Sequence, residues 1–245
     1  MSKRLKLIVA YDGAPFAGWQ SQSHGNTIQD HLEGAFERVA GKPVRVHGAG
    51  RTDAGAHALA QCAHADVNKA LASERWMEAL NALLPPAIRV LRCQYVSNNF
   101  HARLSAKGKV YRYRIWRAPV LPPFEYRRAW HIPRPIDIKI LQKAAKHFVG
   151  THDFAAFAAN RGKLEESTIR TINSVRIRQK DPCVTIEFDG DGFLYKMVRL
   201  IVGSLVKCAL GKMRIEDLRR LDSGQTRAAR FAAPAEGLFL VRVRY

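Results

Sequence analysis

The chain has 245 residues, enough for one large domain or two small ones, and its 47% hydrophobic content excludes an intrinsically disordered protein. Forty Lys and Arg residues against 21 Asp and Glu residues give a formal net charge of +19, which predicts a polyanionic partner, most often nucleic acid. Residues 101–245 hold 29 of the basic and 13 of the acidic residues, so we expect the second half of the chain to present the main surface for that partner.

Membrane association is disfavoured by the hydropathy pattern. The first apolar run ends at Tyr11 and is too short for a secretory signal. The most apolar later stretch, residues 194–210, is interrupted by three basic residues and so is no transmembrane helix. The four cysteines form no Cys-x-x-Cys pair, and free thiols in a chain without a signal favour the cytoplasm.

The first hundred residues mix strands and helices. Residues 5–11 form an apolar run that ends at Asp12-Gly13, which predicts a strand followed by a turn. Thr27 is the expected N-cap of a helix that ends at Gly41. The remaining predicted elements of this half are a strand at 44–47, a helix that Ser73 caps and that ends before Pro85, and a strand at 88–96.

The second half opens with a strand at 109–116 whose residues alternate at period two. Tyr111, Tyr113 and Ile115 share one face, and the other face carries two arginines. The further predicted elements are a helix from Asp137 to about 149, a strand pair at 172–177 and 184–188, a long helix from Phe193 to Leu210 that Gly211 ends, a short helix from 215 and a strand at 238–243. This order favours an α+β fold with antiparallel sheets over a doubly wound parallel sheet.

The glycine-rich loop from Gly48 to His57 is the first candidate site. It begins like a dinucleotide fingerprint, but Asp53 stands where the third glycine is needed, and a carboxylate there would repel a pyrophosphate. What remains is one carboxylate on a loop, with Arg51 two residues away and, in an extended segment, on the same side. This pattern suits a nucleophile or base that a cation orients, but it equally suits a surface turn with an ion pair.

Two further segments combine basic residues with a defined face. The strand at 109–116 interleaves tyrosines and arginines, as in single-stranded RNA binding, although a core strand with one solvated face explains the pattern equally well. In the long helix, Gly203 lies in a stripe with Lys196, Arg199 and Lys207, where it permits close approach of another surface. That stripe is either functional or a solvated helix face. The nine scattered histidines show no metal-ligand spacing.

Three motifs occur in order: Gly50-Arg-Thr-Asp-Ala-Gly-Ala-His57, Lys109-Val-Tyr-Arg-Tyr113 and Gly192-Phe-Leu-Tyr-Lys-Met-Val-Arg199. Together with Tyr11-Asp-Gly-Ala-Pro-Phe-Ala-Gly-Trp-Gln20 and Ala233-Pro-Ala-Glu-Gly-Leu238, they strongly resemble the tRNA pseudouridine synthase A family over nearly the whole chain. Ala56 departs from the valine usual in the family, a change of packing and not of chemistry.

The resemblance implies an isomerase that converts uridine to pseudouridine in the tRNA anticodon stem–loop, at positions 38–40. It implies that Asp53 is the catalytic aspartate, that Tyr111 lies against the target uracil, that Arg199 orients Asp53 and that Arg51 assists base flipping. It also implies a pseudouridine synthase fold of two similar α/β halves, with largely antiparallel sheets flanking a basic cleft. The enzyme would be a homodimer and would need no metal or other cofactor.

We divide the chain at 105/106, with the aspartate loop in the first half and the tyrosine strand and basic helix in the second. Further RNA contacts are expected on two segments, at Phe100, His101 and Arg103 and at Arg161 and Lys163. The sequence leaves open which uridines are modified and whether Asp53 attacks C1′ or removes a sugar proton. The alternative function is a non-catalytic RNA-binding protein, which the joint presence of Asp53, Tyr111 and Arg199 disfavours.

Overall fold

The structure is a computed structural model that describes residues 2–23, 25–159, 167–222 and 231–245. The chain forms two compact units, one of residues 1–107 with 239–245 and one of residues 108–238. The sequence-based division at 105/106 assigned residues 239–245 to the second half, whereas these residues belong to unit 1. None of the helices in the described ranges is long and apolar enough to cross a membrane.

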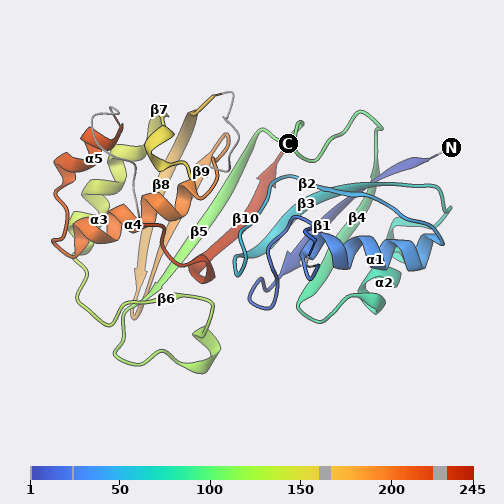
Figure 1. The fold of residues 1–245 in the computed structure, drawn as a ribbon, viewed down its shortest axis with the longest axis horizontal. Helices are drawn as coiled ribbons and strands as arrows, with labels where there is room; N and C mark the ends of the chain where they lie inside the picture. Colours follow the sequence, from blue (N-terminus) through green and yellow to red (C-terminus); the bar gives the residue numbers. More distant parts are fainter. Residues whose placement is uncertain (1, 24, 160–166, 223–230) are drawn as a thin grey trace. The chain divides into compact units, whose positions relative to one another are not determined.

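Unit 1 is a sheet with two helices on it. Its strands follow the order β4 (Ile88–Val96), β1 (Lys3–Tyr11), β3 (His57–Val67) and β10 (Leu238–Arg244, of which Leu238 belongs to unit 2), and β2 (Val46–Gly48) also pairs with β3. All these pairings are antiparallel except that of β10 with β3. The helices α1 (Ile28–Ala40) and α2 (Ser73–Leu83) pack together through Phe36 and Trp76, whose ring centroids lie 5.4 Å apart (Figure 1).

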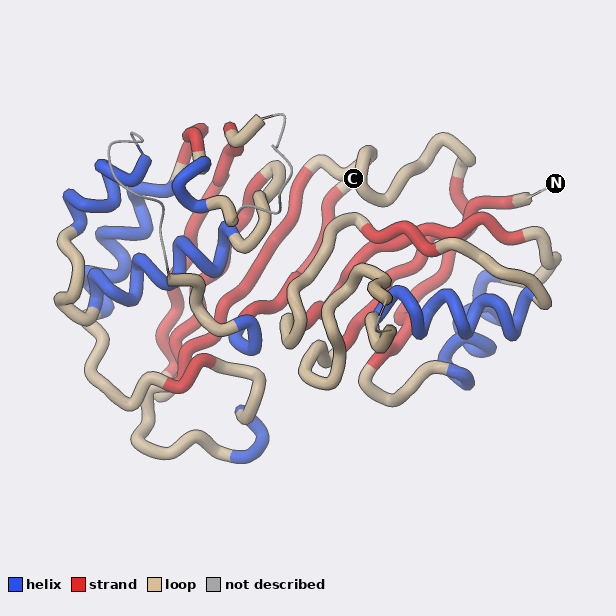
Figure 2. Tube along the Cα trace, in the orientation of Figure 1, coloured by secondary structure: helices blue, strands red, loops and turns tan. Residues whose placement is uncertain are grey.

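Unit 2 repeats this plan with different connections. Its antiparallel strands follow the order β5 (Gly108–Trp116), β9 (Cys183–Gly190), β8 (Ile169–Lys180) and β7 (Gly150–Asp153), with β6 (Trp130–His131) parallel to the end of β5. The helices are α3 (Ile138–Ala145), α4 (Met197–Ala209) and α5 (Ile215–Asp222). In each unit the strands form one layer and the helices another, as Figure 2 shows. Helix α4 is the core helix of unit 2, because 11 of its 13 residues are buried.

Local signals in the sequence explain several element boundaries. Thr27 caps α1 in a reciprocal capping box with Asp30, and Gly41 ends the helix in the left-handed conformation. Asp137 caps α3 through the backbone N–H of Ile140. The predictions of these helices and of the strands β1, β4, β5, β8, β9 and β10 are confirmed.

Three expectations differ from the structure. The long helix was expected to begin at Phe193, but α4 begins at Met197 because Lys196 adopts a left-handed backbone conformation. Ser73 is the first residue of α2 and not its cap, which is Ala72. Strand β3 was not predicted, because its alanine-rich sequence has weak strand propensity and almost no alternation. Pairing with β1 along its length keeps β3 extended in the buried part of the sheet.

Candidate active site

The loop between β2 and β3 carries Asp53 at the start of a tight turn. The backbone N–H of Ala56 donates to the Asp53 carbonyl at 3.1 Å, and Gly55 has a φ of 79°. A positive φ at this third position of a turn favours glycine, which explains the Asp-Ala-Gly sequence. Asp53 is partly exposed in this turn.

A second segment, residues 12–19, braces this turn through its backbone. The N–H of Trp19 donates to the Thr52 carbonyl at 3.1 Å. A Cβ on Gly18, whose φ is 95°, would lie 2.7 Å from the same carbonyl oxygen, and one on Gly13 would collide with the Ala56 carbonyl. A side chain at either glycine would push the turn away. The two glycines therefore allow residues 12–19 to lie against the turn that carries Asp53.

Hydrogen bonds from buried side chains hold two residues that precede Asp53, Gly50 and Thr52. The hydroxyls of Tyr11 and Thr52 share a hydrogen bond of 2.8 Å, and burial raises the pKa of Tyr11 above its usual value. The side-chain amide of Gln61 donates to the Gly50 carbonyl at 2.8 Å. These buried groups anchor the loop to β1 and β3, the two central strands of unit 1.

Arg51 lies on the same loop with an exposed side chain. Its Nε donates to Gln20 Oε1 at 3.1 Å, and the Gln20 amide in turn donates to Gln29 on α1 at 2.7 Å. The guanidinium is therefore tethered to one side of the loop while its outer face meets solvent. A planar cation in this position is available to a nucleic acid.

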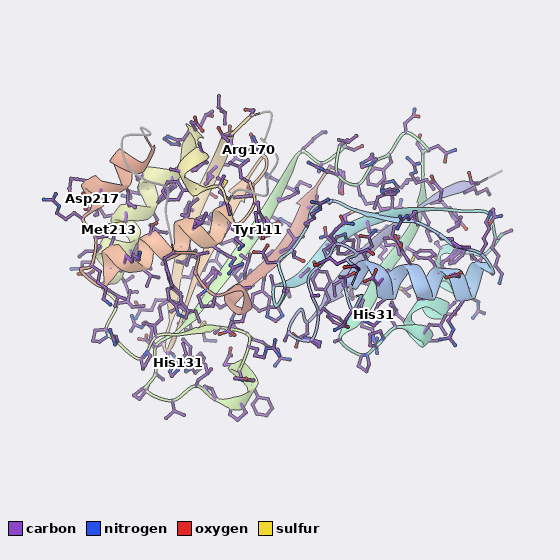
Figure 3. The ribbon with its side chains drawn as sticks, viewed as in Figure 1. His31, Tyr111, His131, Arg170, Met213 and Asp217 are labelled. Carbon is purple, nitrogen blue, oxygen red and sulfur yellow. The ribbon has the colours of Figure 1, made fainter. Side chains whose placement is uncertain are left out.

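In unit 2, Tyr111 lies near the middle of β5 (labelled in Figure 3). Its cross-strand partner on β9 is Phe188. The rings of Tyr111 and Phe193 form a T-shaped pair, with centroids 5.1 Å apart and planes at 83°. The Tyr111 side chain is only 7% exposed. The tyrosine face of the strand is thus the buried face, and the arginines at 112 and 114 occupy the other face.

Arg199 is the third residue of α4, so it projects from the first turn of the core helix. Its Nε donates to the Ala233 carbonyl at 2.7 Å, and the Ala233 N–H donates back to the Arg199 carbonyl at 2.9 Å. The guanidinium is partly buried, and the bond at Nε fixes the direction in which the rest of the group points.

The basic stripe of α4 is covered by the chain itself. A Cβ on Gly203 would collide with the Phe231 carbonyl, so this glycine permits the close approach that the sequence predicted. The Lys207 ammonium lies over the Phe231 ring, 5.4 Å from its centroid. The stripe therefore supports the segment that follows residue 230.

The residues expected to contact RNA outside these motifs have different surroundings. The backbone around Phe100 and His101 is held within unit 1, since Arg4 donates to the Phe100 carbonyl at 2.8 Å and Tyr245 donates to the Ala102 carbonyl at 2.7 Å. Arg103 is exposed. Arg161 and Lys163 lie outside the described residues.

The sequence-predicted residues fall into two groups. Asp53 and Arg51 share a loop in unit 1, and Tyr111 and Arg199 lie in unit 2. Sequence reasoning missed the backbone brace at Gly13 and Gly18, whose only signal was the glycine-rich motif around them. Within the described ranges, no three His, Cys, Asp or Glu side chains are arranged to hold a metal ion.

Comparison with known proteins decides the family. A model of the family described as tRNA pseudouridine synthase matches residues 7–104 and 144–245. The chain belongs to the tRNA pseudouridine synthase family. The matched ranges contain Asp53, Arg51 and Arg199, and Tyr111 lies between them.

Curated members of this family match along nearly the whole chain. A protein of Akkermansia muciniphila named tRNA pseudouridine synthase A is 47% identical over 99% of this chain and 95% of its own length. One of Acetivibrio thermocellus with the same name is 41% identical over 99% of this chain and 100% of its own. Among solved structures, the crystal structure of a Cbf5-Nop10-Gar1 complex is 12% identical with a TM-score of 0.39, over 96% of this chain and 48% of that chain.

Proposed function

We propose that this protein isomerises uridine to pseudouridine in tRNA. Family membership supports the reaction, and the geometry of the Asp53 turn supports it from the structure. The observation that carries the proposal is a partly exposed aspartate at the start of a turn, which neighbouring backbone approaches closely at two glycines and which buried hydrogen bonds hold. Such preorganisation is what a nucleophile or base needs.

The reaction exchanges one bond of the uracil for another. The N1–C1′ bond breaks, a C5–C1′ bond forms, C5 loses its proton and N1 gains one, so there is no net redox change or hydrolysis. Asp53 serves as the nucleophile at C1′ or as the base that removes a sugar proton, and both roles require an ionised carboxylate.

The other residues have supporting roles in this proposal. The Tyr111 ring, which packs against the Phe193 ring, lies against the target uracil. Arg199 orients the catalytic carboxylate from a firm helical support, and Arg51 enters the space that the flipped base vacates. A base within a stem must leave its stack before chemistry can occur, which is why a cationic group is needed beside the nucleophile.

We further propose that the target is the anticodon stem–loop at positions 38–40, that the protein acts as a cytoplasmic homodimer and that it needs no cofactor. The net charge of +19 supports tRNA as the partner, and the free state of all four cysteines is in keeping with the cytoplasm. The further RNA contacts are Phe100, His101, Arg103, Arg161 and Lys163.

Incubation with tRNA labelled with tritium at uracil C5 tests the reaction. Because C5 loses its proton, the protein should release tritium into water in proportion to the pseudouridine formed. Binding of the tRNA without tritium release would overturn the proposal and identify a non-catalytic RNA-binding protein.

A further inference from the structure

The buried residue Tyr113 has no role in the proposed chemistry, although it lies on β5 two residues from Tyr111 and on the same face. Its side chain is fully buried, and its hydroxyl donates to the Pro234 carbonyl at 2.8 Å. A buried hydroxyl costs free energy unless it is bonded, so this contact constrains both groups.

The acceptor belongs to the segment from Phe231 to Gly237, which we call the 231–237 segment. The carbonyl just before that of Pro234 is that of Ala233, which accepts the hydrogen bond from Arg199 Nε. Tyr113 and Arg199 therefore hold two consecutive carbonyls of one short stretch of backbone. A displacement of either carbonyl is passed to the other, because only one planar peptide unit, the fixed φ of Pro234 and its ψ lie between them.

Close packing on both sides leaves this segment little freedom. A Cβ on Gly237 would lie 2.7 Å from the Tyr113 ring, and one on Gly203 of α4 would collide with the Phe231 carbonyl. The segment is thus pressed between β5 and α4, with the Tyr113 ring against one end and the core helix against the other. In such close packing, a displacement of one group shifts the groups that it contacts.

The electrostatic surroundings agree with this geometry. Burial raises the pKa of Tyr113 well above its usual value, so the hydroxyl stays a neutral donor across the physiological range. The charge of Arg199 acts to lower the pKa of this hydroxyl and that of Glu236 acts to raise it, so the hydroxyl lies close enough to Arg199 to interact with its charge.

We propose that Tyr113 is a positioning residue, which sets the direction of the Arg199 guanidinium through the Pro234 and Ala233 carbonyls. The catalytic part of this inference depends on the function proposed above. The strand that presents the uracil-contacting Tyr111 thereby also fixes the cation that orients the catalytic carboxylate.

The test compares Tyr113→Phe with Tyr245→Phe in the full-length protein. The two variants lose the same kind of interaction, since the Tyr245 hydroxyl also donates to a backbone carbonyl, that of Ala102 in unit 1, at 2.7 Å. We expect Tyr113→Phe to lower the single-turnover rate about tenfold with unchanged tRNA affinity, and Tyr245→Phe to leave the rate within about twofold of wild type.

A double variant with Arg199→Lys sharpens the test, because a residue that acts only through Arg199 loses its effect once Arg199 is replaced. Equal losses of rate in the two tyrosine variants, or fully additive losses with Arg199→Lys, would overturn the positioning role.

A readout in the free protein separates this inference from the proposed function. The Arg199 Nε–H signal, assigned by its loss in Arg199→Lys, should exchange with solvent at least about tenfold faster in Tyr113→Phe and be unchanged in Tyr245→Phe. If the wild-type protein released no tritium, the proposed function would fail while this signal still decided the positioning. An unchanged exchange rate of the Arg199 Nε–H in Tyr113→Phe would overturn the positioning role of Tyr113.

Discussion

The two regions that carry the proposed site are held in place by different means. In unit 1, Asp53 stands on a loop, and its position depends on backbone hydrogen bonds and on glycines that let residues 12–19 approach the turn. In unit 2, Tyr111 and Arg199 project from a strand and from the core helix, and the 231–237 segment holds the arginine.

This difference tells which substitutions each region tolerates. The aspartate loop is sensitive to changes of backbone shape, because close contacts with the backbone of residues 12–19 help to locate its turn. The strand and helix have backbones that the sheet and core already fix, so unit 2 is sensitive to the loss of particular side-chain groups. In the proposed site, the group assigned the chemistry lies on a loop, and the residues assigned supporting roles lie on a strand and a helix.

Removing the charge of Asp53 should have the largest effect. Asp53→Asn keeps the shape of the side chain, so the loop and tRNA affinity should be preserved while the single-turnover rate falls by at least about 10³-fold. Tritium release and filter binding measure the two quantities. Glu37→Gln, which neutralises an exposed carboxylate on α1 of the same unit, is the matched control and should change neither. A rate for Asp53→Asn within about tenfold of wild type would remove Asp53 from the chemistry.

Arg51→Lys in unit 1 and Arg199→Lys in unit 2 should differ in how strongly they slow turnover of a paired and of an unpaired target uridine. Arg51→Lys keeps the charge but loses the planar group that fills the place of a base, so we expect a loss of about tenfold or more on an intact stem–loop and a smaller loss on an unpaired target uridine. Arg199→Lys removes the Nε donor to Ala233 and should slow both substrates alike. Equal slowing of the two substrates by Arg51→Lys would show that the flipping role is wrong.

Adding one methyl group should disturb the loop without touching a reactive group. Gly18→Ala combines a positive φ with a Cβ 2.7 Å from the Thr52 carbonyl, so it should cost about 2 kcal/mol of unfolding free energy and slow turnover. Gly34→Ala is the control in the same unit, since a Cβ there meets no atom within 4 Å. It lies inside α1 and should raise stability by about 0.5–1 kcal/mol without slowing turnover. Unaltered turnover in Gly18→Ala would show that the brace does not position Asp53.

Lowering the pH should reduce the stability of unit 1, because folding disfavours the protonated form of His64 on β3. Its ring packs against His47 and His101, and burial together with the Arg4 charge lowers its pKa to about 4. Between the usual pKa of a histidine, about 6.5, and about 4, the unfolded chain binds a proton that the folded chain does not, so stability falls as the pH falls through this window.

His64→Asn keeps an acceptor for the Ala102 N–H and cannot be protonated. The loss of unfolding free energy between pH 7 and pH 5 should shrink by on the order of 1 kcal/mol in this variant. Chemical denaturation at the two pH values measures it, and an identical loss in wild type and variant would contradict the assignment.

Much of the fold was predictable from the sequence, whereas the long-range contacts that hold the candidate site residues were not. The caps at Thr27 and Gly41 and the alternation in β5 are local signals, so the sequence alone predicted these elements. Strand β3 was missed because only its tertiary neighbours make an alanine-rich segment extended. The motifs indicated Asp53 and Arg199. The contacts of Gly18 with the loop and of Ala233 with α4 join residues more than thirty positions apart, and no local pattern records them.

The most direct test of the account is a pseudouridine map of unmodified tRNA after incubation with the protein, using transcripts that carry uridine at positions 38, 39 and 40. We expect pseudouridine in this stretch with the wild-type protein and none with Asp53→Asn at the same extent of tRNA binding. Pseudouridine elsewhere in the tRNA would contradict the anticodon-arm target, and a map without pseudouridine for bound wild-type protein would contradict the isomerase activity itself.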